Sequence, residues 1–157
     1  MLTETDRNEL SAAAQRMDAF FERILGILSD WQPMLRRELG DALRAGRLTS
    51  ELIESLIQPA ADAAIDQTFV YGAGFIADTE VLVGAGSPLA WWQGTDKSRL
   101  AGSSEFADRG YIEYQRLEWF RVPRATRRTH VTGPYVDYLC STELTLTTSL
   151  PLTLDGA

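Results

Sequence analysis

The stretch YIEYQRLEWFRVPRATRRTHVTGPYVDY, residues 111–138, is the part of the chain from which the fold and a candidate site are predicted. Two aromatic-rich runs with the residue types of strands flank a short arginine-rich segment with the character of a helix. The stretch contains six aromatic residues, five of the fifteen lysines and arginines, and the only histidine, His130. Aromatic walls with a few fixed charges suit a small polar ligand, so we expect a binding site here.

Composition restricts the classes of function. The length of 157 residues suits one domain, and 45% apolar with 24% charged residues is ordinary for a soluble globular protein. A net charge of −7 argues against nucleic-acid binding. No apolar run approaches the ~20 residues that span a bilayer, and the acidic start does not resemble a signal peptide, so we predict a cytoplasmic protein without a membrane partner. The single cysteine, Cys140, excludes an internal disulfide and a cysteine-based zinc site.

The N-terminal region, residues 1–66, is predicted to be helical. Thr3 or Thr5 can cap a long helix. Its apolar residues alternate steps of four and three over three heptads, at Leu10, Ala14, Met17, Phe21, Ile24, Leu28 and Trp31. The pattern suits either a homodimer through this helix or a helix packed within its own domain. Pro33 is expected to start a second helix that ends at Gly46, and Thr49 to start a third that Pro59 interrupts.

Residues 67–157 have the pattern of strands. The predicted runs are residues 69–77, 89–94, 111–117, 131–140 and 143–152, with a short helix or turn at 117–128 that Pro123 breaks. The first is expected to bend at Gly72 or Gly74, where another backbone or a ligand comes close. Helices followed by an antiparallel sheet of about five strands predict an α+β fold in one domain.

Catalytic signatures are weak. A serine–histidine–aspartate triad would need His130, yet no nucleophile-elbow sequence is present. Histidine and acidic residues do not share the spacing of metal ligands, so no catalytic residue, metal or cofactor is predicted. An acid pair such as Glu113 with Asp137 stays open. A non-enzyme is the favoured interpretation, with a small enzyme as one alternative and a dimerisation scaffold as the other.

Binding has stronger support in the residues. On a strand, Tyr114 and Arg116 would share one face, and a guanidinium beside aromatic rings suits a carboxylate or phosphate. Tyr135 and Asp137 would share a face of the later strand. Trp91 and Trp92 must point to opposite faces of theirs, so only one of the two can line a given pocket.

The order Tyr111, Arg116, Trp119-Phe120 and Gly133-Pro134-Tyr135-Val136-Asp137, followed by a threonine-rich strand, resembles a Cache sensor domain. It is most similar to the single-Cache modules of actinobacterial cytoplasmic proteins. The resemblance covers about residues 69–152 and implies a PAS-like antiparallel sheet preceded by a long helix. The family binds small metabolites, and some members accompany transcription regulators, which implies a regulatory partner.

By this resemblance Tyr111, Arg116, Trp119 and Tyr135 line a ligand pocket. From the strand faces and the aromatic pattern, we also expect Tyr114, Phe120, Asp137 and Trp92 to contact the ligand. The branch that binds amino acids places its tryptophan one residue nearer the arginine, has tyrosine where Phe120 stands, and takes an ammonium-binding aspartate from a later strand, where only Asp155 remains. The resemblance therefore implies a sensor for a carboxylate-bearing metabolite. An organic acid is favoured, and an amino acid stays open.

Overall fold

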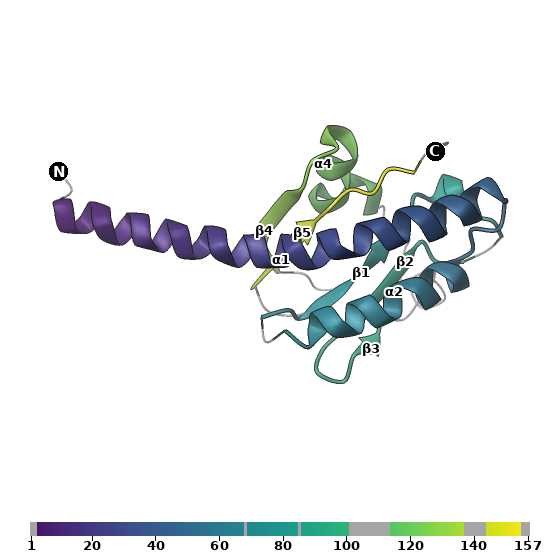
Figure 1. The fold of residues 1–157 in the computed structure, drawn as a ribbon, viewed down its shortest axis with the longest axis horizontal. Coiled ribbons are helices and arrows are strands. Elements are labelled where there is room, and N and C mark those ends of the chain that lie inside the picture. The colour runs from purple at the N-terminus through teal and green to yellow at the C-terminus, as the bar shows by residue number, and fades with distance from the viewer. Residues whose placement is uncertain (1–2, 68, 85, 101–113, 137–143, 155–157) are drawn as a thin grey trace.

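The computed structural model describes residues 3–67, 69–84, 86–100, 114–136 and 144–154. Helices come first and antiparallel strands follow, so the predicted α+β class is confirmed (Figure 1). The elements are α1 (Glu4–Arg44), α2 (Ser50–Ile65), β1 (Gly72–Ile76), the 3-10 helix η1 (Thr79–Val81), β2 (Leu89–Gln93), β3 (Ser98–Arg99), the 3-10 helix η2 (Tyr114–Arg116), α4 (Glu118–Thr126), β4 (His130–Val136) and β5 (Leu144–Ser149).

Helix α1 is a single helix of 41 residues, about 60 Å long at ~1.5 Å per residue. Thr3 caps it in a capping box: its hydroxyl accepts from the amide of Asp6, whose carboxylate accepts from the amide of Thr3. The prediction that Pro33 starts a second helix is wrong, because α1 continues through it. Proline removes one backbone hydrogen bond, but Trp31 and Leu35 on either side pack against the core and hold the helix together.

Helix α2 begins where the sequence indicated, with the hydroxyl of Thr49 accepting from the amide of Leu52 at 3.3 Å. The predicted interruption at Pro59 is absent, since α2 runs from Ser50 to Ile65. Ile57 and Ala61 flank the proline, and both are fully buried. Burial of this face outweighs the one hydrogen bond that proline cannot make.

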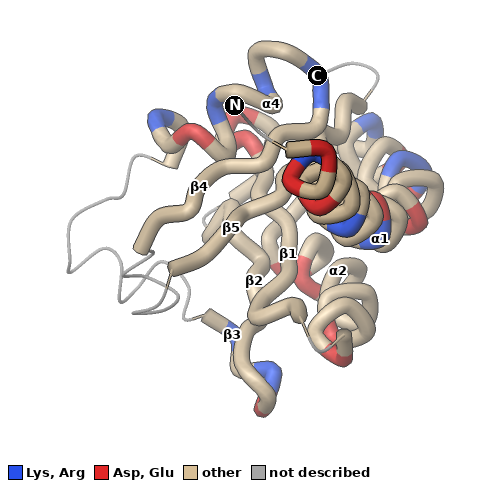
Figure 2. The backbone as a smooth tube through the Cα atoms, turned by 90° about the vertical axis from the view of Figure 1, so that its left-hand side faces the viewer, with Lys and Arg blue, Asp and Glu red and all other residues tan. Residues whose placement is uncertain are grey.

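Strands β1, β2 and β3 form an antiparallel sheet, with Gly74 opposite Trp91 and Trp92 opposite Arg99. A Cβ atom at Gly74 would lie 2.1 Å from the carbonyl oxygen of Ala90, so the expected close approach of another backbone at this glycine is confirmed. Both long helices lie on one side of this sheet (Figure 2).

One core joins the helical region to the strands. Leu39 of α1, Ile57 of α2, Ala73 of β1 and Trp92 of β2 belong to one cluster of buried residues. Residues 1–66 therefore do not bury their apolar faces alone in this structure, because the sheet supplies the opposing layer.

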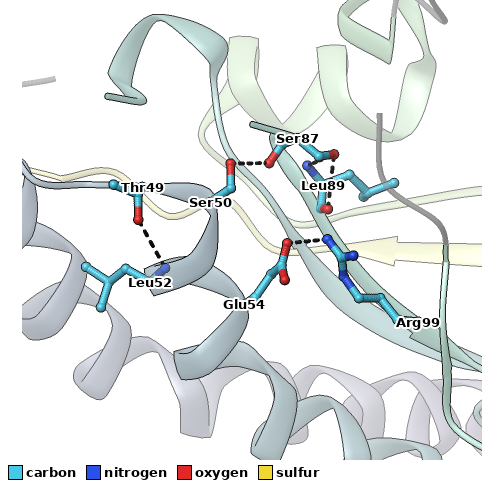
Figure 3. Close-up of polar contacts among 7 residues, drawn as sticks. All are labelled: Thr49, Ser50, Leu52, Glu54, Ser87, Leu89 and Arg99. Atoms are coloured by element: carbon cyan, nitrogen blue, oxygen red, sulfur yellow. Dashed lines mark hydrogen bonds and ion pairs between the residues drawn. The ribbon is translucent and has the colours of Figure 1, made fainter. Parts of the chain in front are cut away.

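Polar contacts fix α2 against the sheet (Figure 3). The hydroxyl of Ser50 donates to the carbonyl oxygen of Ser87 at 2.8 Å, and Glu54 forms an ion pair with Arg99 of β3. These contacts lie at the start and in the first half of α2. They set the position of the helix along the strands, which apolar packing alone leaves less defined.

The C-terminal elements form a second unit, in which α4 packs on the antiparallel pair β4–β5. Thr132 lies opposite Thr147, and the register shifts between Thr132 and Tyr135. The predicted strand over residues 111–117 is wrong for Tyr114–Arg116, which form η2. In this short turn the ring of Tyr114 is buried and packs edge-on against Phe120 at 5.0 Å, a contact that the helical geometry allows.

The predicted break at Pro123 is also absent, because α4 continues to Thr126 and ends with Arg127 in the left-handed conformation (φ 55°). Within the described residues, the five strands fall into sheets of three and two rather than one. β5 lies between β4 and β1 (Figures 1 and 2), but within the described residues it is hydrogen-bonded to β4 only. The two sheets remain separate, and a groove lies between them.

Candidate functional site

The groove has a volume of about 1460 Å³ and is bounded by α1, by β1 and β2, and by α4, β4 and β5. Its apolar floor comes from the C-terminal half of α1, where Trp31, Leu35 and Leu39 recur at helical spacing. It exceeds the ~300–1,000 Å³ of typical ligand pockets, so it is an open groove that can hold a metabolite in one part.

Aromatic rings from several elements line the walls, among them Phe75 of β1. Trp91 comes from β2, Trp119 and Phe120 from α4, and Tyr135 from β4. The indole of Trp91 lies against Gly72, where a Cβ would sit 2.9 Å from the ring, and its N–H donates to Gln93 at 3.2 Å. The glycine in β1 therefore makes room for this ring at the wall of the groove.

The polar residues of the groove lining include Asp78, which follows β1, and Thr132 of β4. One carboxylate oxygen of Asp78 forms an ion pair with Arg124 of α4 at 2.6 Å. The other carboxylate oxygen, and the hydroxyl oxygen of Thr132, are buried and have no hydrogen-bond partner within the described part of the chain. Thr132 is only 7% exposed. Burying such atoms unpaired costs about 1–3 kcal/mol each, so the groove suits a ligand that supplies hydrogen bonds.

A second polar contact lies on β4–β5. The hydroxyl groups of Tyr135 and Thr147 are 2.5 Å apart, and the hydroxyl of Thr145 donates to the carbonyl oxygen of Tyr135 at 3.2 Å. These bonds hold the Tyr135 ring on the groove side of the hairpin, and they position the neighbouring wall.

The segment after β5 connects the groove to α1. The side chain of Gln32 donates to the carbonyl oxygen of Pro151 at 3.3 Å, and Arg36 donates to that of Thr153 at 2.8 Å. These contacts join the segment after β5 directly to α1 by hydrogen bonds. A displacement of β5 would therefore disturb the hydrogen bonds that Gln32 and Arg36 of α1 donate to this segment.

His130 and Glu118 are the acid–base pair nearest to this site, with 2.8 Å between the imidazole Nε2 and the carboxylate. Glu118 lines the groove, and more than half of its side chain is exposed. A carboxylate that holds an imidazole is an arrangement that enzymes use. Among the described residues, however, no serine, threonine or cysteine is hydrogen-bonded to this histidine.

The structure brings together only part of the predicted site. Trp119, Phe120 and Tyr135 line the groove. Trp92 belongs to the buried core, so Trp91 is the tryptophan that faces the groove.

Two further predicted residues lie away from the groove lining. Tyr114 is buried beneath it and donates to the carbonyl oxygen of Ala77 at 3.3 Å. Arg116 is exposed on η2 and is not part of the lining, because the strand that was to place it among the rings is absent. Tyr111, Asp137, Glu113, Asp155 and Cys140 lie outside the described residues.

Sequence reasoning missed Asp78, Thr132 and Arg124. Arg124 lies on the groove wall with Asp78 as its partner. Only the alternation of β4, which places Thr132 two residues from His130, hinted that one threonine faces inward. The ion pair of Asp78 with Arg124 joins segments far apart in the chain, and no local pattern indicates that.

No group of three potential metal-binding side chains occurs among the described residues. No helix in the described ranges is long and apolar enough to cross a membrane. Comparison with known proteins finds no matching family model, curated protein or solved structure.

Proposed function

We propose that the chain is a non-catalytic sensor module that binds a small carboxylate-bearing metabolite in the groove and relays binding to a regulatory partner. The observation that carries the proposal is that two buried polar atoms of the groove lining, on Asp78 and Thr132, have no hydrogen-bond partner among the described residues, in a groove that has aromatic walls and the Asp78–Arg124 ion pair. Apolar walls with a few convergent polar groups are typical of ligand sites. The resemblance to Cache domains points the same way.

Arg124 replaces Arg116 as the proposed anchor for the carboxylate. A guanidinium is a planar fork that matches two carboxylate oxygens, and Arg124 already holds a carboxylate in this position. Its side chain is about half exposed, so it can turn toward an incoming ligand, whereas Arg116 lies on η2 away from the lining. Phe120 and Trp119 beside it lower the local dielectric and strengthen the pairing.

Asp78 narrows the ligand class. A simple anion that captured Arg124 would leave a carboxylate that is only 21% exposed without its partner. Stranding a largely buried charge in this way is costly. An amino acid avoids the cost, because its ammonium group can replace the guanidinium at Asp78 while its carboxylate takes Arg124. The charge balance therefore favours amino acids over simple organic acids, although both belong to the proposed class.

The proposed relay uses the segment after β5. Closure of the C-terminal unit on a ligand would displace the carbonyl groups of Pro151 and Thr153, which accept hydrogen bonds from α1. A regulatory partner that contacts α1 would then sense the ligand. The relay requires that the ligand bind the closed arrangement more tightly than the open one.

A thermal-shift screen of amino acids and organic acids tests the proposal. A ligand at ~100 times its Kd stabilises by about 2.7 kcal/mol, which raises Tm by about 5–11 °C for a chain of this size. We expect Arg124→Ala to abolish the shift and Arg116→Ala, the matched control, to retain it. The absence of any stabilising compound would contradict the function, while loss of the shift in Arg116→Ala alone would contradict the anchor.

Turnover of the compound that binds would favour the alternative of a small enzyme, and the pair of His130 and Glu118 is then the group to examine. Product formation that Glu118→Gln abolishes would identify that chemistry. The alternative of a dimerisation scaffold without a cavity is less well supported, because the groove leaves a wide space between the two sheets.

A further inference from the structure

The N-terminal half of α1 projects beyond the rest of the molecule (Figure 1). Among the described residues, the first ring contact of α1 with a later part of the chain is that of Phe20 with Phe69, which lies between α2 and β1, at 5.1 Å. Residues 4–19 have no hydrogen bond, ion pair or ring contact to another described element. Helices of fewer than about 12–15 residues are marginally stable alone in water, and most helices depend on packing of an apolar face. The projecting half therefore lacks the support that the other half receives.

The apolar face of this projecting half continues the face that packs on the core. Leu10, Met17, Ile24 and Trp31 lie seven residues apart, so they drift by only about 20° per repeat around the helix. Trp31 packs against the core, whereas Leu10 is 57% and Met17 is 60% exposed. Single exposed apolar residues are common. Here, however, Leu10 and Met17 continue the same face of α1 that packs on the core at Trp31.

We propose that this face pairs with the same face of a second copy of the chain, with the two α1 helices antiparallel. The order Leu10, Ala13, Ala14, Met17 is symmetric about its centre, with a large residue at each end and small residues between. A two-fold axis between Ala13 and Ala14 places Leu10 of each copy against Met17 of the other. The central alanines let the helix axes approach to about 8 Å.

The antiparallel direction follows from where the body lies. From Trp31 onward, the same face of α1 is covered by the body of its own chain. A parallel pair would direct both bodies into one space between the helices. An antiparallel pair places the two bodies at opposite ends of the paired helices. Each body then lies away from the two-fold axis by about 1.5 Å for every residue of α1 between them.

Charge is consistent with this direction. Glu9 and Arg16 are seven residues apart and lie on the same flank of the apolar face. The two-fold axis of an antiparallel pair leaves the matching flanks of the two helices on the same side of the dimer. It therefore brings Glu9 of one copy within about one turn of Arg16 of the other, and this contact occurs twice per dimer. This pairing adds specificity rather than much affinity, because both side chains are exposed.

Light scattering during size-exclusion chromatography tests the pairing. We expect a dimer for the unmodified chain and a monomer for Leu10→Glu/Met17→Glu. The matched control Asn8→Glu/Gln15→Glu adds the same charge on the other side of α1, and it should remain dimeric. All four positions are exposed, so unchanged circular dichroism of the folded body is expected. A monomeric unmodified chain, or a control that dissociates equally, overturns the proposal.

Disulfide trapping tests the direction. On a Cys140→Ser background, Leu10→Cys mixed with Met17→Cys should form a cross-linked dimer on oxidation. Leu10→Cys alone should not, because the axis separates the two copies of that position by about 10 Å along the helix, beyond disulfide reach. Efficient cross-linking of Leu10→Cys alone would show a parallel pair and overturn the proposal.

Discussion

The packing of α2 on the sheet predicts a large and specific loss of stability for Ile57→Ala. Ile57 is fully buried in the core cluster that α1, α2 and the strands share. Removal of its outer carbon groups costs about 2–2.5 kcal/mol in transfer free energy, at ~0.8 kcal/mol per group. The cavity left in a packed interior adds about 1–1.5 kcal/mol, for a total loss of about 3–4 kcal/mol in the free energy of unfolding.

Urea unfolding followed by tryptophan fluorescence measures this loss, since Trp92 lies in the same core cluster. The melting temperature should fall by about 6–16 °C, at ~2–4 °C per kcal/mol. Leu144→Ala is the matched control, because Leu144 is 72% exposed and its truncation should change stability by less than about 0.5 kcal/mol. If Ile57→Ala loses under ~1 kcal/mol, or no more than the control, α2 does not pack as described.

The remaining predictions concern glycine and pH. Gly74→Ala should destabilise the protein by about 1–3 kcal/mol, since the new Cβ meets the backbone of β2. Gly26→Ala, which adds a Cβ in open space on α1, should stabilise it by about 0.5–1 kcal/mol. Equal effects of the two substitutions in thermal melts would contradict the strand pairing. The Thr3 side chain, and then its backbone amide, hold the pKa of Asp6 below 3.8. The first turn of α1 is therefore fully stabilised above that pH and loses this contribution as pH falls through the lowered pKa. An NMR titration of the Asp6 carboxyl should show the low pKa, and Thr3→Ala should raise it; an unchanged pKa in that variant would contradict the capping box.

The order of elements was predictable because each leaves a periodic pattern. Steps of four and three residues indicated the long helix, and β-rich alternation indicated β4 and β5. The cap at Thr49 was also local, since it depends on one hydroxyl and the amide three residues later. These features are determined by groups close together in the chain, which is why sequence reasoning reached them.

The two helix breaks were wrong for a tertiary reason. Pro33 and Pro59 each remove one backbone hydrogen bond, and locally that loss favours a break. Ile57 and Ala61 beside Pro59 are fully buried, and this burial outweighs the missing bond. The strength of that packing depends on strands later in the chain, so the local pattern could not reveal it.

The candidate site was likewise only partly predictable from the sequence. Trp119, Phe120 and Tyr135 were predicted as ligand contacts, and they do line the groove, because aromatic residues beside strands tend to form walls. Arg116 was chosen for its place in an expected strand, and η2 directs it elsewhere. Alternation alone also could not decide between Trp91 and Trp92, since the pattern does not indicate which face of β2 the helices cover.

The sequence by itself determined the α+β class, the long capped helix with its continuous apolar face, and the aromatic character of the C-terminal unit, because hydrophobic periodicity and capping act over a few residues. Tertiary structure alone decided that the strands divide into two sheets with a groove between them. It also decided that Asp78 pairs with Arg124 there and that Thr132 lines the same groove. These residues come from segments far apart in the chain, and only the tertiary arrangement brings them to one groove.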